Sequence, residues 1–196
     1  MNRYIVGVSG ASGMILAVRM VQALAHLGHH IELVITSGAL YTATLELGKE
    51  YSTATKWVDS FPEEVKNKIH LNLIQDLGCM IASGTYLVDG MVIIPCSMAT
   101  VAAISMGLGD NALRRAADVT LKEKRPLVVV PRESPFSEIH LENLWKLAKV
   151  GATILPPIPA WYLHPKSLEE VENFIVGKVL DAFRLPHNLF QRWGGN

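Results

Sequence analysis

The stretch Tyr4-Ile5-Val6-Gly7-Val8-Ser9-Gly10-Ala11-Ser12-Gly13 opens the chain with an apolar run that ends in a glycine-rich turn. The run has the length and composition of a buried strand, and the apolar spacing of residues 14–27 predicts a helix after the turn. Glycines let the backbone come close to a ligand, and the N-terminus of the following helix favours phosphate. A tight packing turn between strand and helix explains the glycines about as well.

Apolar runs and helical patterns alternate along the rest of the chain. We expect further strands at residues 31–36, 69–74, 91–95, 127–130 and 152–155. We expect helices at residues 39–47, 62–68, 111–124 and 138–150, one from residue 98, and a last one opened by a Ser167–Glu170 capping box. This pattern predicts a single flavodoxin-like or Rossmann-like α/β domain over residues 1–196, with a doubly wound parallel sheet and helices on both faces.

Length and composition exclude several classes of protein. The 196 residues are enough for one full core but too few for two ordinary domains, and 49% hydrophobic against 18% charged residues excludes disorder. A net charge of zero disfavours nucleic acid and anionic membranes as partners. Such a low surface charge also suggests that other subunits cover part of the surface.

The remaining composition bears on metals and location. Two cysteines and seven scattered histidines form no disulfide framework or zinc-binding pattern, so we expect no metal. We expect Cys96 to be a buried small residue rather than a nucleophile. The N-terminus does not resemble a signal peptide and the apolar runs are short, which predicts a cytoplasmic protein.

Four loops follow the expected strands at the sheet edge where doubly wound proteins bind ligands: residues 9–13, 36–38, 95–100 and 131–136. Ser97 and Thr100 could cap the next helix, but two such loops on one edge favour a phosphorylated ligand. Glu32 keeps dinucleotide binding open, although it lies early in its strand rather than at the end. Arg132 and Glu133 follow a buried strand, where a charged pair is costly unless it has a function.

Longer stretches of the chain closely resemble the flavin prenyltransferase family (UbiX type). The matching segments follow one order along nearly the whole chain: Gly10-Ala11-Ser12-Gly13, Pro95-Cys96-Ser97 with Thr100, Arg115-Ala116-Ala117-Asp118-Val119, Leu121-Lys122-Glu123-Lys124-Arg125-Pro126-Leu127-Val128, Pro131-Arg132-Glu133-Ser134-Pro135-Phe136, His140-Leu141, Pro156-Pro157-Ile158-Pro159-Ala160-Trp161-Tyr162 and Arg192-Trp193. The Arg–Glu loop and the Leu-Lys-Glu segment before it are highly specific.

The resemblance implies a homo-oligomer, a dodecamer in this family, that joins a dimethylallyl group from dimethylallyl (mono)phosphate to N5 and C6 of reduced FMN. The product is prenylated FMN, the cofactor of UbiD-type decarboxylases, and no metal is required. The FMN-binding residues implied are Gly10, Ala11, Ser12, Thr36, Ser37, Ser97, Thr100 and Arg132. The implied donor site consists of Lys122, Arg132, Glu133, Tyr162 and Lys178. The catalytic residues implied are Ser12, Glu46, Lys122, Glu133 and Trp193, the last closing the site onto a neighbouring subunit.

Some points stay open. Lys178 stands where arginine is common, which keeps the charge but loses the bidentate fork, and a solvated surface lysine is the alternative. Glu46 or the departing phosphate could take the proton lost from the flavin ring. An FMN-dependent cysteine decarboxylase is a second candidate, but Ser83-Gly84-Thr85-Tyr86 lacks the histidine that such enzymes place before the Pro95 region. A non-catalytic flavin-binding protein is the third.

Overall fold

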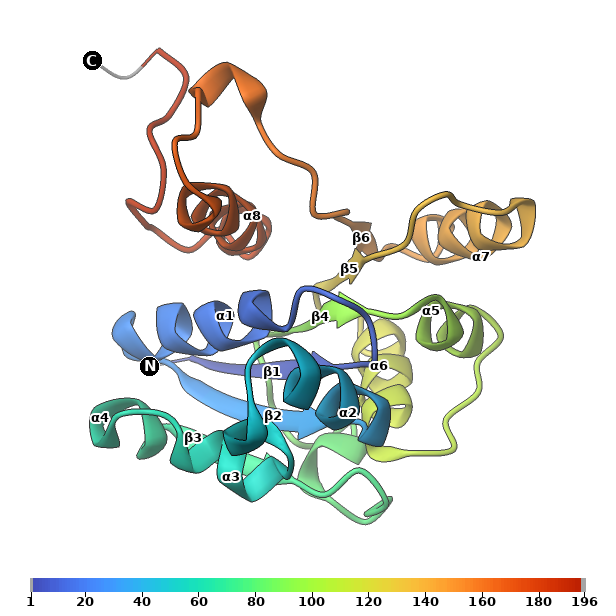
Figure 1. Cartoon of the computed structure of the whole chain (residues 1–196). Helices are drawn as coiled ribbons and strands as arrows, with labels where there is room; N and C mark the ends of the chain where they lie inside the picture. Colours follow the sequence, from blue (N-terminus) through green and yellow to red (C-terminus); the bar gives the residue numbers. More distant parts are fainter. Residues whose placement is uncertain (1, 195–196) are drawn as a thin grey trace.

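A six-stranded parallel sheet forms the centre of the protein, which the computed structural model describes over residues 2–194 (Figure 1). Its strands are β1 (Arg3–Val8), β2 (His30–Ile35), β3 (Ile69–Asn72), β4 (Gly90–Cys96), β5 (Leu127–Pro131) and β6 (Thr153–Ile154). They lie in the order β3-β2-β1-β4-β5-β6, and all are parallel. The order changes direction between β1 and β4, where doubly wound sheets bind ligands. The predicted fold class is confirmed.

Helices cover both faces of this sheet. They are α1 (Met14–His26), α2 (Ser37–Glu46), α3 (Ala54–Asp59), α4 (Glu63–Lys66), α5 (Met98–Ser105), α6 (Ala112–Lys122), α7 (Glu138–Lys149) and α8 (Leu168–Ala182). Short 3-10 turns are η1 (Lys49–Tyr51), η2 (Met80–Ala82) and η3 (Trp161–Leu163). Helices α1 and α8 share one core layer with the sheet, and α5, α6 and α7 share the other. Within residues 2–194, no helix is long and apolar enough to cross a membrane.

Alternation along β1 explains how one strand serves two cores. Tyr4, Val6 and Val8 pack into the layer of α1 and α8, while Ile5 packs into the layer of α6. Gly7 faces α6, and a Cβ at this position would lie 3.2 Å from the Leu113 side chain. The glycine therefore allows α6 to pack close to the sheet.

The expected helix starts need two corrections. The hydroxyl of Ser167 accepts the amide of Glu170, but the Glu170 carboxylate accepts the amide of Lys166, one residue earlier than a capping box requires. Ser137 and His140 form a capping box instead, in which each side chain accepts the other residue's amide. A histidine at the third position replaces the usual glutamate, so the sequence pattern does not reveal it.

The chain beyond the sheet forms a separate C-terminal arm. Helix α8 packs on α1, and the η3 turn and the C-terminal tail lie beyond α8, on its far side from the sheet (Figure 1). We call residues 184–194 the C-terminal strap. It runs back along α8 and brings Trp193 to Tyr162 of η3, with ring centroids 5.3 Å apart.

Candidate functional site

The ends of β1 and β4 are joined by a small hydroxyl network. The Ser9 hydroxyl accepts the amide of Ser97 at 2.8 Å, and the Ser97 hydroxyl donates to Thr100 Oγ1 at 3.1 Å. Ser9 and Thr100 are almost fully buried. Sequence analysis assigned Ser97 and Thr100 but not Ser9, which forms the bond between the two loops. Its position directly after a buried strand was the available signal.

These hydroxyls stand at the N-terminus of α5. The Ser97 side chain caps this helix by accepting the Thr100 amide at 3.3 Å. Several amides of a first helical turn have no partner inside the helix, and together with the helix dipole they favour a phosphate group. The serine and threonine hydroxyls add donors of the right kind. This end of β4 therefore fits the phosphate of a mononucleotide such as FMN.

The N-terminus of α1 is occupied by a side chain of the protein itself. The Glu46 carboxylate, at the end of α2, accepts the amides of Gly13 at 3.0 Å and Met14 at 2.9 Å. A carboxylate there satisfies two amides and the positive end of the helix dipole. The expectation of two phosphate-binding helix ends is therefore corrected to one, at α5. Glu46 instead lies beside the predicted flavin-binding turn, where a proton acceptor could reach a ligand.

The predicted flavin-binding turn touches the first turn of α2. A Cβ on Gly10 would lie 2.9 Å from the carbonyl carbon of Gly38, so only glycine allows this approach of two backbones. Thr36 caps α2 by accepting the Ala39 amide, and Ser37 follows it as an exposed residue. Ala11 and Ser12 lie in the same turn as Gly10 and are partly exposed. The predicted FMN-binding residues of β1 and β2 therefore lie together at one sheet edge.

Arg132 and Glu133 follow β5 on the same edge. The amide of Arg132 donates to the Cys96 carbonyl, which fixes this loop against the end of β4. Both side chains are exposed, so the expected cost of burying this charged pair does not arise. Together with residues 134–136, they line a surface groove that residues 156–158 close on the other side. The side chains are free to contact a ligand in that groove.

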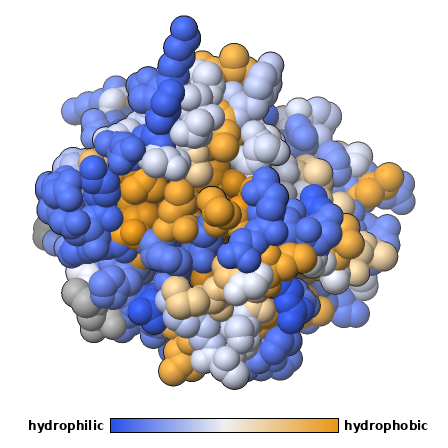
Figure 2. All heavy atoms as spheres, turned by 90° about the horizontal axis from the view of Figure 1, so that it is seen from below, coloured by the Kyte–Doolittle hydropathy of each residue, from blue (hydrophilic) through white to orange (hydrophobic). Residues whose placement is uncertain are grey.

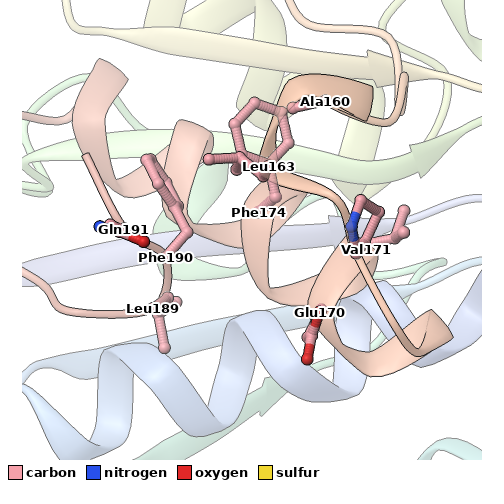
Figure 3. Close-up of a pocket in the computed structure, with 9 residues that line it drawn as sticks. Ala160, Leu163, Glu170, Val171, Phe174, Leu189, Phe190 and Gln191 are labelled. Atoms are coloured by element: carbon pink, nitrogen blue, oxygen red, sulfur yellow. The ribbon is translucent and has the colours of Figure 1, made fainter. Parts of the chain in front are cut away.

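Three other predicted residues lie at the C-terminal arm. Tyr162 and Trp193 are neighbours and are both exposed, at 53% and 83% of their full surface. The Lys178 ammonium lies 3.4 Å from the Asp181 carboxylate on α8. The apolar cavity between α8, η3 and the strap is lined mainly by Leu163, Val171, Phe174, Leu189 and Phe190 (Figure 3). This cavity lacks the cations that a phosphate needs, so it is not the donor phosphate site.

Lys122 lies near the amino ends of the strands, opposite the carboxyl ends where the predicted ligand-binding loops stand. It ends α6 immediately before β5, pairs with Glu123 and stands beside Gly84, ahead of β4. Arg132 and Ser97 follow the carboxyl ends of the strands, whereas Lys122 precedes the amino ends. Within one chain, the fold therefore does not bring Lys122 to the other predicted donor residues.

Two further groups were candidates for chemistry. Burial raises the pKa of the Cys96 thiol to about 12, so it stays protonated and is no nucleophile at neutral pH. Among residues 2–194, no group of three or more His, Cys, Asp or Glu could hold a metal ion. The hydroxyls of Ser97 and Thr100, the amides at the start of α5 and the Arg132 side chain are groups that can bind phosphate.

The sequence analysis missed a buried network at the amino edge. Glu32 is 3% exposed and accepts hydrogen bonds from the Tyr86 hydroxyl at 2.5 Å and from the Asn72 amide at 2.9 Å. His70 Nδ1 lies 2.7 Å from the same carboxylate. Glu32 therefore holds the loop before β4 against the sheet, which excludes its suggested role as a ribose-binding acid at the ligand edge.

Comparisons with known proteins show the family to which the chain belongs. Residues 1–180 match the Flavoprotein family. The chain is 51% identical over 193 residues to the flavin prenyltransferase UbiX of Chlamydia trachomatis, with 98% of each chain covered.

Two solved structures extend the comparison. One is the crystal structure of AnUbiX (PadA1) in complex with FMN and dimethylallyl pyrophosphate, which matches with a TM-score of 0.88, 38% identity and coverage of 99% of this chain and 98% of that chain. The other is a dodecameric FMN-dependent UbiX-like decarboxylase from Escherichia coli O157:H7, with a TM-score of 0.88, 40% identity and coverage of 98% and 100%.

Proposed function

Because this chain belongs to the flavin prenyltransferase (UbiX) family, we propose that it transfers a dimethylallyl group from a dimethylallyl phosphate to N5 and C6 of reduced FMN. The observation that carries the proposal is the hydroxyl network at the N-terminus of α5, directly beside the Gly10 turn. The network supplies a phosphate site, and the glycine-rich turn stands beside it at the switch point of the sheet. A bound mononucleotide requires both features.

The flavin-binding residues hold FMN in a fixed place and orientation. Ser97, Thr100 and the first turn of α5 hold the flavin phosphate, and Arg132 adds a positive charge from the neighbouring loop. The Gly10-Ala11-Ser12 turn together with Thr36 and Ser37 holds the ring system. FMN supplies the nucleophilic ring atoms, while the protein fixes their distance and angle to the donor.

The donor-binding residues assist the departure of phosphate. Lys122, Arg132 and Lys178 neutralise the charge that develops on the leaving group, and the Tyr162 hydroxyl donates to it. Glu133 completes this set beside Arg132. The ring face of Trp193 stabilises the allylic cation as it forms. Glu46, held at the edge of the flavin turn, is placed to accept the proton that the ring loses.

Because the proposed donor-binding residues lie apart within one chain, a complete donor site requires more than one copy of the chain. Lys122 stands at the amino edge of the sheet, whereas Arg132 stands at the carboxyl edge, so a complete donor site takes Lys122 from another copy. Large apolar side chains such as Leu73, Leu77 and Leu87 are exposed, and the face seen from below carries an apolar patch framed by polar residues (Figure 2). Such patches mark interfaces between proteins. We propose a homo-oligomer, with twelve copies as in the solved relative.

The experiment compares three mixtures that contain the protein without oxygen. Two contain reduced FMN, one with dimethylallyl phosphate and one with the pyrophosphate. The third contains a peptide that ends in cysteine and oxidised FMN, which is the electron acceptor that oxidative decarboxylation needs. A prenyltransferase consumes reduced FMN only with a prenyl donor, and the rates with the two donors identify the preferred phosphate. Oxidative decarboxylation of the peptide would support the cysteine decarboxylase alternative instead. FMN that binds but is unchanged in all three mixtures would indicate a flavin-binding protein without catalysis.

Two further proposals follow from the family. The product passes to a UbiD-type decarboxylase, and the protein acts in the cytoplasm. Adding the product mixture to such a decarboxylase in its apo form tests the first. Activity of the decarboxylase that depends on this protein and its donor is the expected result.

A further inference from the structure

We infer that Asp181 is a positioning residue for donor binding, which fixes the C-terminal strap with Trp193 and also contacts Lys178 directly. The inference rests on the proposed function and concerns Asp181, to which neither the sequence nor the resemblance gave a role. Asp181 lies on α8, one turn beyond Lys178, and faces the strap. The contacts of this one carboxylate connect the helix to the strap.

Asp181 binds three positively charged or donating side chains. The Arg192 guanidinium donates to Oδ1 at 2.8 Å and to Oδ2 at 3.4 Å, which is a two-point contact. The His187 ring lies 3.2 Å from Oδ1, and the Lys178 ammonium lies 3.4 Å from Oδ2. A forked pair of this kind restricts orientation as well as distance. Arg192 directly precedes Trp193, so the same contact limits where the indole can lie.

The two ring nitrogens of His187 connect the Leu189 amide to the Asp181 carboxylate. Its Nδ1 accepts the amide of Leu189 at 3.2 Å, which leaves Nε2 to carry the proton and donate to Asp181. The side chain is 3% exposed. His187 therefore ties the turn of the strap to the same carboxylate.

Gly177 shows that the strap is built into the surface of α8. A Cβ at this position would lie 2.6 Å from Cε1 of Phe190 and 2.8 Å from Cε1 of His187. Glycine inside a helix is less favourable than alanine. The glycine lies in α8 at the point where the rings of Phe190 and His187 pack against the helix.

Apolar packing alone does not fix the strap. Phe190 packs on Phe174 with centroids 5.0 Å apart, but a surface pocket of about 220 Å³, lined also by the polar residues Glu170 and Gln191, remains between the strap, α8 and η3 (Figure 3). Apolar contacts therefore cover only part of the strap, and its polar contacts complete the attachment to α8. The polar anchor at Asp181 therefore decides where Trp193 meets Tyr162.

The test uses two variants and one control. Asp181→Asn removes the charge that holds Arg192 and Lys178, and Gly177→Ala displaces the rings of Phe190 and His187 while favouring the helix. Asp110→Asn is the control, because Asp110 is an exposed partner of Arg114 on another helix. Amide hydrogen exchange in residues 184–194 reports on the strap. Titrations of the full-length protein with FMN, and of the FMN-loaded protein with dimethylallyl phosphate, report on the site.

We expect exchange in the strap to become about tenfold faster or more in both variants, and the Kd of dimethylallyl phosphate to rise by a similar factor. The Kd of FMN and the properties of Asp110→Asn should match wild type. Unchanged exchange, or faster exchange with an unchanged donor Kd, would overturn the inference. A wild-type protein that binds the donor without converting reduced FMN would overturn the proposed function alone, because strap exchange and donor Kd still decide the role of Asp181.

Discussion

Glu46 caps a helix, and we propose that it also takes part in the chemistry. Its carboxylate accepts the amides of Gly13 and Met14 at the start of α1, next to the predicted flavin-binding turn. Glu46→Gln keeps an oxygen acceptor but loses the charge, which costs roughly 0.3–1 kcal/mol at a helix N-terminus. We expect FMN binding to persist and the conversion of reduced FMN to slow strongly. Single-turnover rates and urea unfolding measure the two effects, with exposed Glu50→Gln as the control. Conversion at the wild-type rate would show that Glu46 only caps the helix.

Lys178 is either a donor-binding residue or a charged surface residue, and two substitutions distinguish these alternatives. Loss of one charge-assisted contact to phosphate costs about 1.5–3 kcal/mol, or roughly ten- to a hundredfold in affinity. Lys178→Ala should raise the KM of the donor by that factor and leave FMN affinity nearly unchanged. Lys178→Arg should be tolerated, because the fork binds both phosphate and Asp181. Donor-dependent turnover at low donor concentration measures both. Wild-type turnover of the alanine variant would make Lys178 a surface lysine.

At the scale of elements, the Glu32 network couples the loop before β4 to the sheet. Burial raises the pKa of this carboxyl, but hydrogen bonds from Tyr86, Asn72 and His70 outweigh it and leave the pKa below its usual value. A lowered folded-state pKa stabilises the fold above the unfolded pKa of about 4.5, and this stability is lost as the pH falls through the folded value. Burial and the bond to Glu32 raise the pKa of Tyr86 to about 12, so its hydroxyl remains a donor.

Tyr86→Phe tests this coupling. Removal of a hydrogen bond to a buried charged group should lower the free energy of unfolding by about 1.5–3 kcal/mol near neutral pH. The difference from wild type should shrink as the pH falls below about 4.5 and through the lowered folded-state pKa, where the Glu32 carboxylate that accepts this bond becomes protonated. Urea unfolding at several pH values measures it, and Tyr41→Phe is the control because Tyr41 is 71% exposed. A difference that is small, or independent of pH, would contradict the role of Glu32.

Much of the element order could be predicted because the buried strands appear as continuous apolar runs and many helices show regularly spaced apolar residues. The runs at β1, β4 and β5 are buried on both faces, so they read as continuous apolar stretches. Helix α3 was missed because its six residues are too few to show a period, although Trp57 is completely buried. Contacts such as Glu46 with Met14 join residues far apart in sequence, which no local pattern encodes.

For the whole molecule, the proposed division of the donor site between two copies of the chain can be tested by mixing variants. Lys122→Ala and Arg132→Ala should each lose most activity, because each removes a cation from the donor phosphate. Assemblies that contain both variants should regain activity, since some sites take Lys122 from one copy and Arg132 from another. Co-expression with two affinity tags yields the mixed assemblies. Activity that stays absent in them would place both residues of a site in one chain.

The most direct measurement of the proposed function is the mass of the flavin after one anaerobic turnover with reduced FMN and deuterated dimethylallyl phosphate. We predict a flavin that carries the whole deuterated group, with NMR signals that show new bonds to N5 and C6. The Lys178→Ala variant should form the same product more slowly at low donor concentration. Recovery of unmodified FMN from the wild-type protein, with the donor intact, would contradict the assignment of this chain as a flavin prenyltransferase.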